Sequence, residues 1–157
     1  MKKVLMLVAL LSGYSLYGQI PVKKDIKPVL VAIQVSNLDS SIHFYTKYLG
    51  LQLAERKKFE DYHLEIAFLK NKDFELELVK NDSSINKNLV LKEKRATDIT
   101  GFAKISFQVE EIEQIYNYLK SENIPIIISL RKSTRNKEHQ TFIVTDYEGN
   151  WIQFAGK

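Results

Sequence analysis

The hydrophobic pattern of residues 29–80 recurs over residues 101–156, and this repeat constrains the fold more than any other feature of the chain. Residues 31–53 (VAIQVSNLDSSIHFYTKYLGLQL) align loosely with residues 104–126 (KISFQVEEIEQIYNYLKSENIPI). In each copy an apolar strand precedes an amphipathic helix and three further strands. Two βαβββ modules predict an α+β fold in which each helix covers one face of its own sheet.

The first module is expected over residues 29–80. Its helix should span residues 38–49, because apolar residues recur there at helical spacing, Asn37 can cap its start and Gly50 can end it. In the remaining segments of this module, apolar residues either alternate with polar residues or are nearly continuous, and both patterns are typical of strands. The expected strands are residues 29–36, 51–59, 62–69 and 74–80.

The second module, residues 101–156, follows a polar, aperiodic linker over residues 81–100. Its helix is expected over residues 111–123, and residues 148–150 (EGN) indicate a tight turn before the last strand. Together the modules predict a curved, eight-stranded mixed sheet with an open concave cleft. The strands expected in module two are residues 102–109, 125–130, 139–146 and 151–154.

The N-terminus has the layout of a secretory signal peptide. Lys2 and Lys3 precede an unbroken apolar run over residues 4–11, which is too short to span a bilayer. We expect residues 1–18 to be removed, residues 19–28 to form a lead-in, and the protein to be periplasmic or secreted. An uncleaved membrane anchor or a buried first strand is the alternative.

Composition excludes several classes of function. The chain of 157 residues has no cysteine, so disulfides and thiolate metal sites are absent. Its net charge of +4 falls to +2 without residues 1–18, which hold two lysines and no acid. The remaining lysines are scattered among acids, so we expect neither nucleic-acid binding nor, after cleavage of the leader, membrane binding. A monomer and a homodimer are both compatible with two modules in one chain.

The open face of the first module is predicted from strand pairing. We expect Leu64, Ile66 and Phe68 to face the helix and a three-residue turn at residues 70–72, which would place Glu65 opposite Glu77. On the neighbouring strand, Leu51 and Leu53 should face the helix and leave the alternate residues on the open side. The expected open-face residues of chemical interest are Arg56, His63, Glu65, Glu75 and Glu77.

The second module should present an equivalent face. Trp151, the only tryptophan, could stack on a ligand or pack against the end of the chain. The basic loop of residues 131–137 could steer an anion or simply be solvated. The expected residues of this face are Lys104, Ser106, Gln108, Arg131, Ile143, Trp151 and Gln153.

Residues 31–39 (VAIQVSNLD) and residues 145–154 (TDYEGNWIQF) carry a family resemblance. With Ser41, Phe44, Tyr45 and the Leu49-Gly50-Leu51 sequence, they resemble the vicinal oxygen chelate superfamily, which includes glyoxalase I, extradiol dioxygenases, methylmalonyl-CoA epimerase, and the bleomycin- and fosfomycin-resistance proteins. The resemblance covers residues 29–156. It implies the paired-module fold, but it does not identify a reaction.

The resemblance also implies four metal-ligand positions, typically a His and a Glu in each module. Here they are Leu30, Glu77, Lys104 and Gln153. Leu30 has no donor atom, Lys104 would bring an ammonium group to a cation site, and Gln153 is a weak oxygen ligand. We therefore expect no metal cofactor, and propose that a Glu77–Lys104 ion pair, supported by Glu65 and Arg56, replaces it. The alternative is that these charges are solvated separately.

Three readings of function follow. The first is an exported domain that binds a small polar or amphipathic molecule in its cleft without metal. The second is a divalent-metal-dependent lyase, isomerase or dioxygenase that uses Glu77 with non-standard ligands such as His63, with Glu65 and Glu77 as candidate acid and base. The third is a non-catalytic interaction protein with a vestigial cleft.

Overall fold

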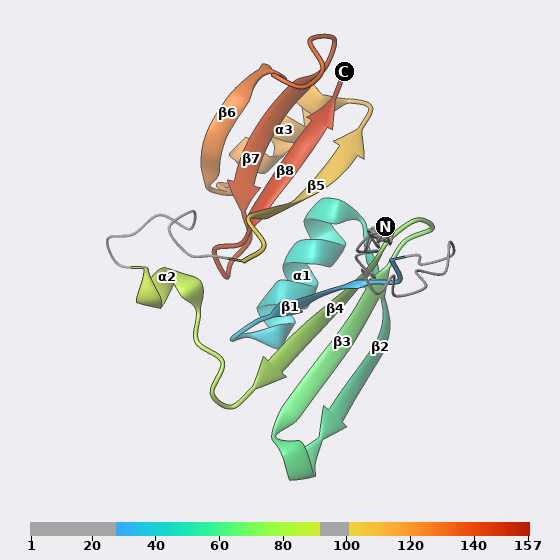
Figure 1. Ribbon diagram of the computed structural model, residues 1–157, viewed down its shortest axis with the longest axis vertical. Helices are drawn as coiled ribbons and strands as arrows, with labels where there is room; N and C mark the ends of the chain where they lie inside the picture. The colour runs from blue at the N-terminus through green and yellow to red at the C-terminus, as the bar shows by residue number, and fades with distance from the viewer. Residues whose placement is uncertain (1–27, 92–100) are drawn as a thin grey trace, which may run out of the picture.

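The computed structural model describes residues 28–91 and 101–157, where the βαβββ order occurs twice (Figure 1). The predicted leader, residues 1–18, lies outside the described residues. Module one consists of β1 (Val31–Gln34), α1 (Leu38–Leu49), β2 (Gln52–Phe59), the 3-10 helix η1 (Glu60–Tyr62), β3 (Leu64–Lys70) and β4 (Glu75–Asn81). Module two consists of β5 (Lys104–Val109), α3 (Ile112–Ser121), β6 (Ile126–Lys132), β7 (Gln140–Thr145) and β8 (Trp151–Gly156). A four-residue helix, α2 (Lys87–Val90), lies within the stretch predicted to be a linker.

The two modules have the same strand order, which confirms the predicted fold class. The eight strands form two four-stranded mixed sheets, β1-β4-β3-β2 and β5-β8-β7-β6. In each sheet the first strand of the module pairs in parallel with the last, and the other pairings are antiparallel. The first strand therefore lies at a sheet edge in both modules. None of the helices in the described ranges has the length and apolar character needed to cross a bilayer.

Helix α1 begins and ends where the sequence predicts. The Asn37 side chain accepts a hydrogen bond from the Ser40 N–H at 3.1 Å, which satisfies one of the free donors of the first turn. Gly50 adopts a left-handed conformation with φ of 66°, which costs a glycine little, and its N–H donates to the Tyr45 carbonyl.

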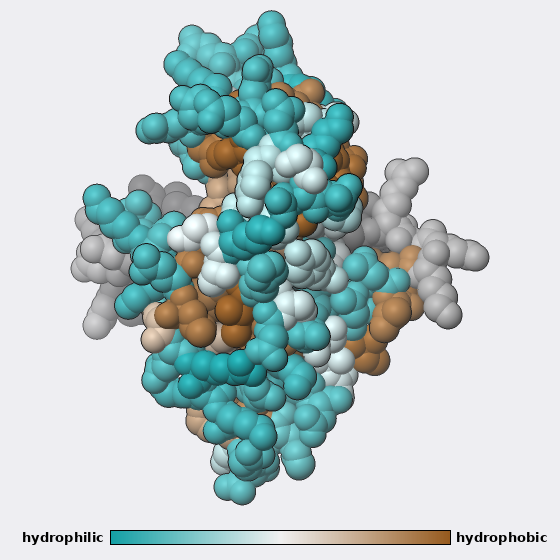
Figure 2. Space-filling model, turned by 180° about the vertical axis from the view of Figure 1, so that it is seen from behind, coloured by the Kyte–Doolittle hydropathy of each residue, from teal (hydrophilic) through white to brown (hydrophobic). Residues whose placement is uncertain are grey.

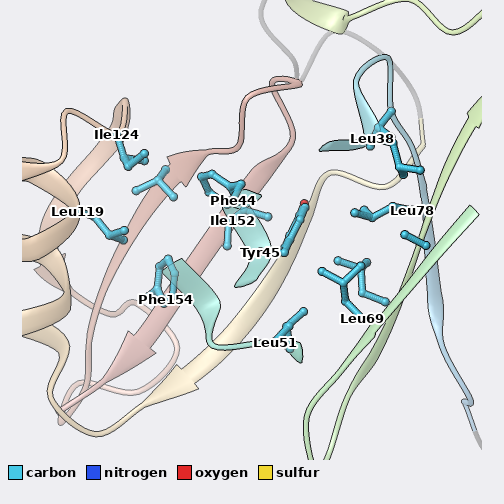
Figure 3. Packing of buried hydrophobic residues seen from close by; sticks show 14 of the residues in the cluster. Leu38, Phe44, Tyr45, Leu51, Leu69, Leu78, Leu119, Ile124, Ile152 and Phe154 are labelled. Atoms are coloured by element: carbon cyan, nitrogen blue, oxygen red, sulfur yellow. The ribbon is translucent and has the colours of Figure 1, made fainter. Parts of the chain in front are cut away.

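A single hydrophobic core spans both modules. In Figure 3, Phe44 and Tyr45 of α1 lie between Leu69 and Leu78 of sheet one and Phe154 of sheet two. Both α1 residues are fully buried. Helix α1 therefore covers its own sheet and also packs against the other module, which fixes the modules relative to each other.

The β3–β4 hairpin has a different register from the one predicted. Ala67 pairs with Leu78 and Phe68 with Glu77, whereas Glu65 pairs with Lys80. The prediction that Glu65 lies opposite Glu77 is therefore wrong. The observed register differs from the predicted one by three residues, and any odd offset moves every side chain of a strand to the other face of the sheet.

The turn explains this register. Asn71 donates its N–H to the Phe74 carbonyl, and its side-chain oxygen accepts from the N–H groups of Asp73 and Phe74. The turn thus closes at Asn71 and Phe74 instead of spanning residues 70–72. The buried residues of β3 are Ala67 and Leu69, whereas Phe68 shares the open face with Glu77.

The predicted place of Arg56 is also wrong, because β2 contains an irregularity. The pairing of β2 with β3 shifts between Leu53 and Glu55, so that Arg56 pairs with Ala67. Since Ala67 lies on the helix-facing side, Arg56 lies there too. A bulge of this kind adds one residue to a strand and reverses its alternation from that point on.

Candidate functional site

The open face of module one is more apolar than predicted. Strand β4 contributes Glu75 and Glu77, and the adjacent β3 residues on this face are Lys70, Phe68 and Ile66. Each glutamate thus lies beside a non-acidic neighbour on β3. The like-charge pair expected from the sequence is absent here, and no shared proton or metal is needed to relieve it.

Arg56, Glu65 and His63 belong to a different part of the surface. Arg56 donates to Asp39 of α1 at 2.6 Å and to Glu65 at 3.0 Å, and Lys80 lies 3.4 Å from the same Glu65. The guanidinium group of Arg56 lowers the pKa of the Glu65 carboxyl below its usual value. These residues tie β2 and β4 to the start of α1, which is a structural role.

His63 is exposed at the beginning of β3. Its Nδ1 lies 3.1 Å from the Asp82 carboxylate, and its backbone adopts a left-handed conformation with φ of 49°. His63 does not lie on the face of the sheet that carries Glu77. The observed β3–β4 register places Glu65 on the opposite face, and the prediction places His63 on the same face as Glu65. The same change separates Glu65 from Glu77 as a candidate acid and base.

The residues on the open face of module two are those that the period-two alternation of its sequence predicts. Lys104 pairs with Trp151 on the adjacent strand, Ser106 with Gln153, and Gln153 with Ile143. The Gln153 amide is held on both sides. Its nitrogen donates to the Thr141 hydroxyl at 2.7 Å and its oxygen accepts from Ser106 at 3.2 Å.

The four positions at which the family resemblance implies a metal do not offer a suitable donor set. Leu30 is apolar, Lys104 is cationic, and the Gln153 oxygen already accepts a hydrogen bond from Ser106. Glu77 alone would supply a carboxylate oxygen. Across residues 28–91 and 101–157, His, Asp and Glu side chains form no group of three or more that could hold a metal ion.

The hypothesis of a Glu77–Lys104 ion pair is not supported. Within the described part of the chain, no ion pair joins these two residues, and Arg56 and Glu65 pair with each other away from Glu77. Lys104 is exposed and forms no ion pair with any described residue. The ammonium group of Lys104 is therefore available to bind a ligand group beside it.

Beside Lys104 the structure contains a cavity of about 240 Å³ between the edge strands β1 and β5. Its walls come from both modules, from α2 and from the β7–β8 turn. Neither Glu77 nor any residue of the basic loop 131–137 lines it. The lining residues are Val31, Ala32, Ile33, Gln34, Lys87, Leu91, Gly101, Phe102, Ala103, Lys104, Ile105, Gly149, Asn150 and Trp151.

Three of the residues predicted from the sequence therefore lie near one another at the cavity. A further lining residue, Lys87, was not predicted. Lys104 and Trp151 line the cavity, and Gln153 follows Trp151 on the same face of β8. The Trp151 side chain is half-buried, with part of it available to a ligand. Lys87 was missed because it lies in the polar stretch predicted to be a linker, where the sequence has no periodicity that would place it.

The β7–β8 turn holds two buried acids that sequence reasoning also missed. Glu148 accepts hydrogen bonds from the backbone N–H groups of Ser36 and Asn37, at 3.0 and 2.9 Å, and from the Ser36 hydroxyl at 2.9 Å. Glu148 as a residue is 3% exposed. A negative charge at this point also interacts favourably with the positive end of the α1 dipole.

Asp146 forms the second half of this network. It accepts from the Tyr45 hydroxyl at 2.8 Å and from the N–H groups of Glu148 and Asn150 at 3.0 and 2.7 Å. Burial raises the pKa of Asp146 above its usual value, although its hydrogen bonds act in the opposite direction. Burial, followed by the nearby Asp146 charge, likewise raises the pKa of Tyr45. We call these contacts of Glu148 and Asp146 the turn network.

Comparison with known proteins gives matches to a family and to solved structures. The family model described as Glyoxalase/Bleomycin resistance protein/Dioxygenase superfamily matches residues 27–154. No curated protein sequence matches the chain.

Three solved structures illustrate the structural similarity. Their sequence identities to this chain are low, so the similarity shows the fold alone. The protein SMU.1112c is 23% identical, with a TM-score of 0.68 over 83% of this chain and 98% of its own. A glyoxalase family protein from Enterococcus faecalis is 20% identical, with a TM-score of 0.65 over 84% of this chain and 97% of its own. The trypanothione-dependent glyoxalase I of Leishmania major is also 20% identical, with a TM-score of 0.65 over 83% and 87%.

Proposed function

Since the chain belongs to the glyoxalase/bleomycin resistance protein/dioxygenase superfamily, we propose that it uses the family fold to bind a small molecule without the metal that the resemblance implies. The cavity between β1 and β5 is the observation that carries this proposal. Both modules line it, and its walls combine apolar side chains with a few polar groups, as small-molecule sites do.

The chemistry of the implied metal positions supports a binding role over metal-dependent catalysis. A single carboxylate, a hydrogen-bonded amide and a lysine do not form a site for a divalent ion. Without a metal or a neighbouring base, Glu77 has no partner for proton transfer, because Glu65 lies on the other side of the sheet.

The proposal includes export of the domain, which rests on the pattern of residues 1–18 in the sequence. The expected setting is the periplasm or the exterior of the cell. Detection of a chain that begins near residue 19 in a secreted or periplasmic fraction, by mass spectrometry of its N-terminal peptide, would support export. A full-length chain in the cytoplasm would contradict it.

Metal content is the first test of the proposed function. The domain, dialysed against a mixture of divalent ions and then against metal-free buffer, should retain far less than one metal per chain in elemental mass spectrometry. Near-stoichiometric metal would contradict the proposal and favour a lyase, isomerase or dioxygenase that recruits ligands other than the four positions named above.

A thermal-shift screen is the second test. A molecule that binds only the folded state raises its stability by RT ln(1 + [L]/Kd), or about 2.7 kcal/mol at a ligand concentration of 100 Kd. The library should contain neutral, cationic and anionic small molecules in equal number. Failure of every class to raise the unfolding temperature would favour the hypothesis of a non-catalytic interaction protein.

The surface bears on that alternative. On the face seen in Figure 2, hydrophobic residues form separate groups among hydrophilic ones and not one continuous patch.

A further inference from the structure

The charged residues that line the cavity, within residues 28–91 and 101–157, are all cationic. Among the residues that the structure describes, Lys87 and Lys104 line the cavity and no aspartate or glutamate does. The chain as a whole is only mildly basic, with 23 basic and 19 acidic residues. Two lysines on the described walls of the cavity are therefore a local arrangement that favours an anion.

Lys87 is held in place by the docking of α2 on the β7–β8 turn. Its Nζ donates to the Asn150 side-chain oxygen at 2.8 Å, and the Asn86 side chain donates to the Tyr147 carbonyl at 3.0 Å. The turn approaches α2 so closely that a Cβ on Gly149 would lie 2.6 Å from the Asn88 side-chain oxygen. The partner of Lys87 is a neutral amide, so its positive charge is not neutralised by that contact.

Lys104 presents its charge next to the only tryptophan of the chain. Lys104 and Trp151 are paired residues on the parallel strands β5 and β8, and both line the cavity. An indole face stacks on flat apolar groups, and the adjacent ammonium group binds an anion at the edge of such a group. The two side chains therefore favour a molecule with both features.

The rest of the lining is mainly apolar and sets the size of the occupant. Val31, Ile33, Leu91, Phe102 and Ile105 contribute hydrophobic groups. An apolar cavity of about 150 Å³ is large enough to hold benzene. At about 240 Å³, this cavity has room for one ring and a short acidic side chain.

From these features we infer that the cavity selects a small amphipathic organic acid, with one ring-sized apolar body and one carboxylate. The apolar body lies against Trp151 and the walls of β1 and β5, and the carboxylate is bound by Lys104 and Lys87. This inference rests on the proposed function, since it names the ligand class of the same cavity.

The test compares three probes of nearly equal shape: 3-phenylpropanoate, 3-phenylpropanamide and 3-phenylpropylammonium. Because Trp151 is the only tryptophan, its fluorescence reports binding in this cavity directly, and isothermal titration calorimetry gives the affinity. The carboxylate is expected to bind about tenfold more tightly than the amide, as a charged hydrogen bond gives. The ammonium compound should bind least.

Variants separate the charge of the cavity from its shape. Lys104→Met and Lys87→Met each remove one cation and should reduce the preference for the carboxylate over the amide severalfold. The double variant should abolish the preference, whereas Lys104→Arg should keep most of it. Lys120→Met, on the exposed side of α3, removes a lysine far from the cavity lining and is the matched control.

Each outcome decides the inference. Equal affinity for the carboxylate and the amide, a preference that survives in the double variant, or a carboxylate Kd weaker than about 1 mM would overturn it. If neutral or cationic molecules bind while the carboxylate does not, the ligand class is wrong and the proposed binding function stands. If no member of the broader library binds, the proposed function itself fails.

Discussion

The turn between β3 and β4 and the turn between β7 and β8 occupy equivalent places in the two repeats, but they contact the other module in different ways. The first is polar and exposed except for Phe74, whose ring meets Phe107 of β5 edge-to-face at 5.3 Å between centroids. The second buries Asp146 and Glu148, of which Glu148 binds the backbone just before α1 and Asp146 binds Tyr45 further along the helix. One repeat thus docks through an aromatic contact and the other through a polar network.

The difference shows how a duplicated unit becomes asymmetric. An aromatic contact tolerates small shifts, whereas a buried carboxylate requires each of its donors in place because unsatisfied buried groups are costly. The polar turn is also the one that supports α2 and with it Lys87. The cavity therefore lies beside the more rigidly specified of the two turns.

The largest expected effect comes from removing the buried carboxylate of the polar turn. Glu148→Ala leaves the N–H groups of Ser36 and Asn37 without their acceptor, and should lower the free energy of unfolding by about 3 kcal/mol. Urea unfolding followed by circular dichroism would measure it. Glu148→Gln keeps one acceptor oxygen and should cost about half as much. A loss below about 1 kcal/mol in the Ala variant would show that the network adds little.

The matched change in the other turn should have a smaller effect. Phe74→Ala removes the contact with Phe107 and part of the buried area, for a loss of about 2 kcal/mol, since Phe74 is only half-buried. Phe74→Leu retains most of the apolar area and should cost less than about 1 kcal/mol. If Phe74→Ala costs more than Glu148→Ala in the same urea assay, the ranking of the two contacts is wrong.

A glycine substitution links the polar turn to the cavity. Gly149 has φ of 83° and lies against Asn88, so Gly149→Ala should lower stability by about 1–2 kcal/mol. It should also displace α2 and weaken 3-phenylpropanoate binding severalfold, as is expected of Lys87→Met. Gly50→Ala is the control for backbone strain alone, because Gly50 has φ of 66°, nothing lies within 4 Å of its added Cβ, and it does not line the cavity. If Gly149→Ala leaves the affinity for 3-phenylpropanoate unchanged, the position of Lys87 does not depend on the β7–β8 turn.

The smallest effect concerns pH. Because burial raises the pKa of Asp146, the folded state holds this proton more tightly than the unfolded state. The contribution of Asp146 to stability is therefore complete below the usual aspartate pKa and is lost as pH rises through the raised value. Tyr45→Phe removes a hydrogen bond to the carboxylate, so the pKa should rise further. Carbon-13 NMR titration of the Asp146 carboxyl in both proteins measures this, and a lower pKa in Tyr45→Phe would contradict the assignment.

Much of module two and all of α1 could be predicted from the sequence, because there the signals agree. Asn37, the helical spacing and Gly50 specify the same helix, and Lys104, Trp151 and Gln153 alternate as their strands require. The β3–β4 register could not be predicted, because β3 carries apolar residues on both faces. Leu64, Ile66 and Phe68 read as a core stripe, yet the buried residues are Ala67 and Leu69.

The candidate site was predicted in part for the same reason. Its module-two half follows from alternation, whereas Arg56, His63 and Glu65 were misplaced by a bulge and by the length of a turn, which single-sequence patterns do not reveal. The cavity itself depends on α2, whose position is set by contacts with residues some sixty places further along the chain.

The hydrogen bonds between Ser36 and Glu148 join positions 112 residues apart, and this has a consequence for the order of folding. The N–H groups of Ser36 and Asn37 obtain Glu148 as their acceptor only when the β7–β8 turn is present, so module one cannot complete its native contacts while the ribosome is still synthesising module two. Closure of so long a loop is slow relative to local helix formation. The nascent chain therefore stays short of its final state until the β7–β8 turn of module two has been synthesised.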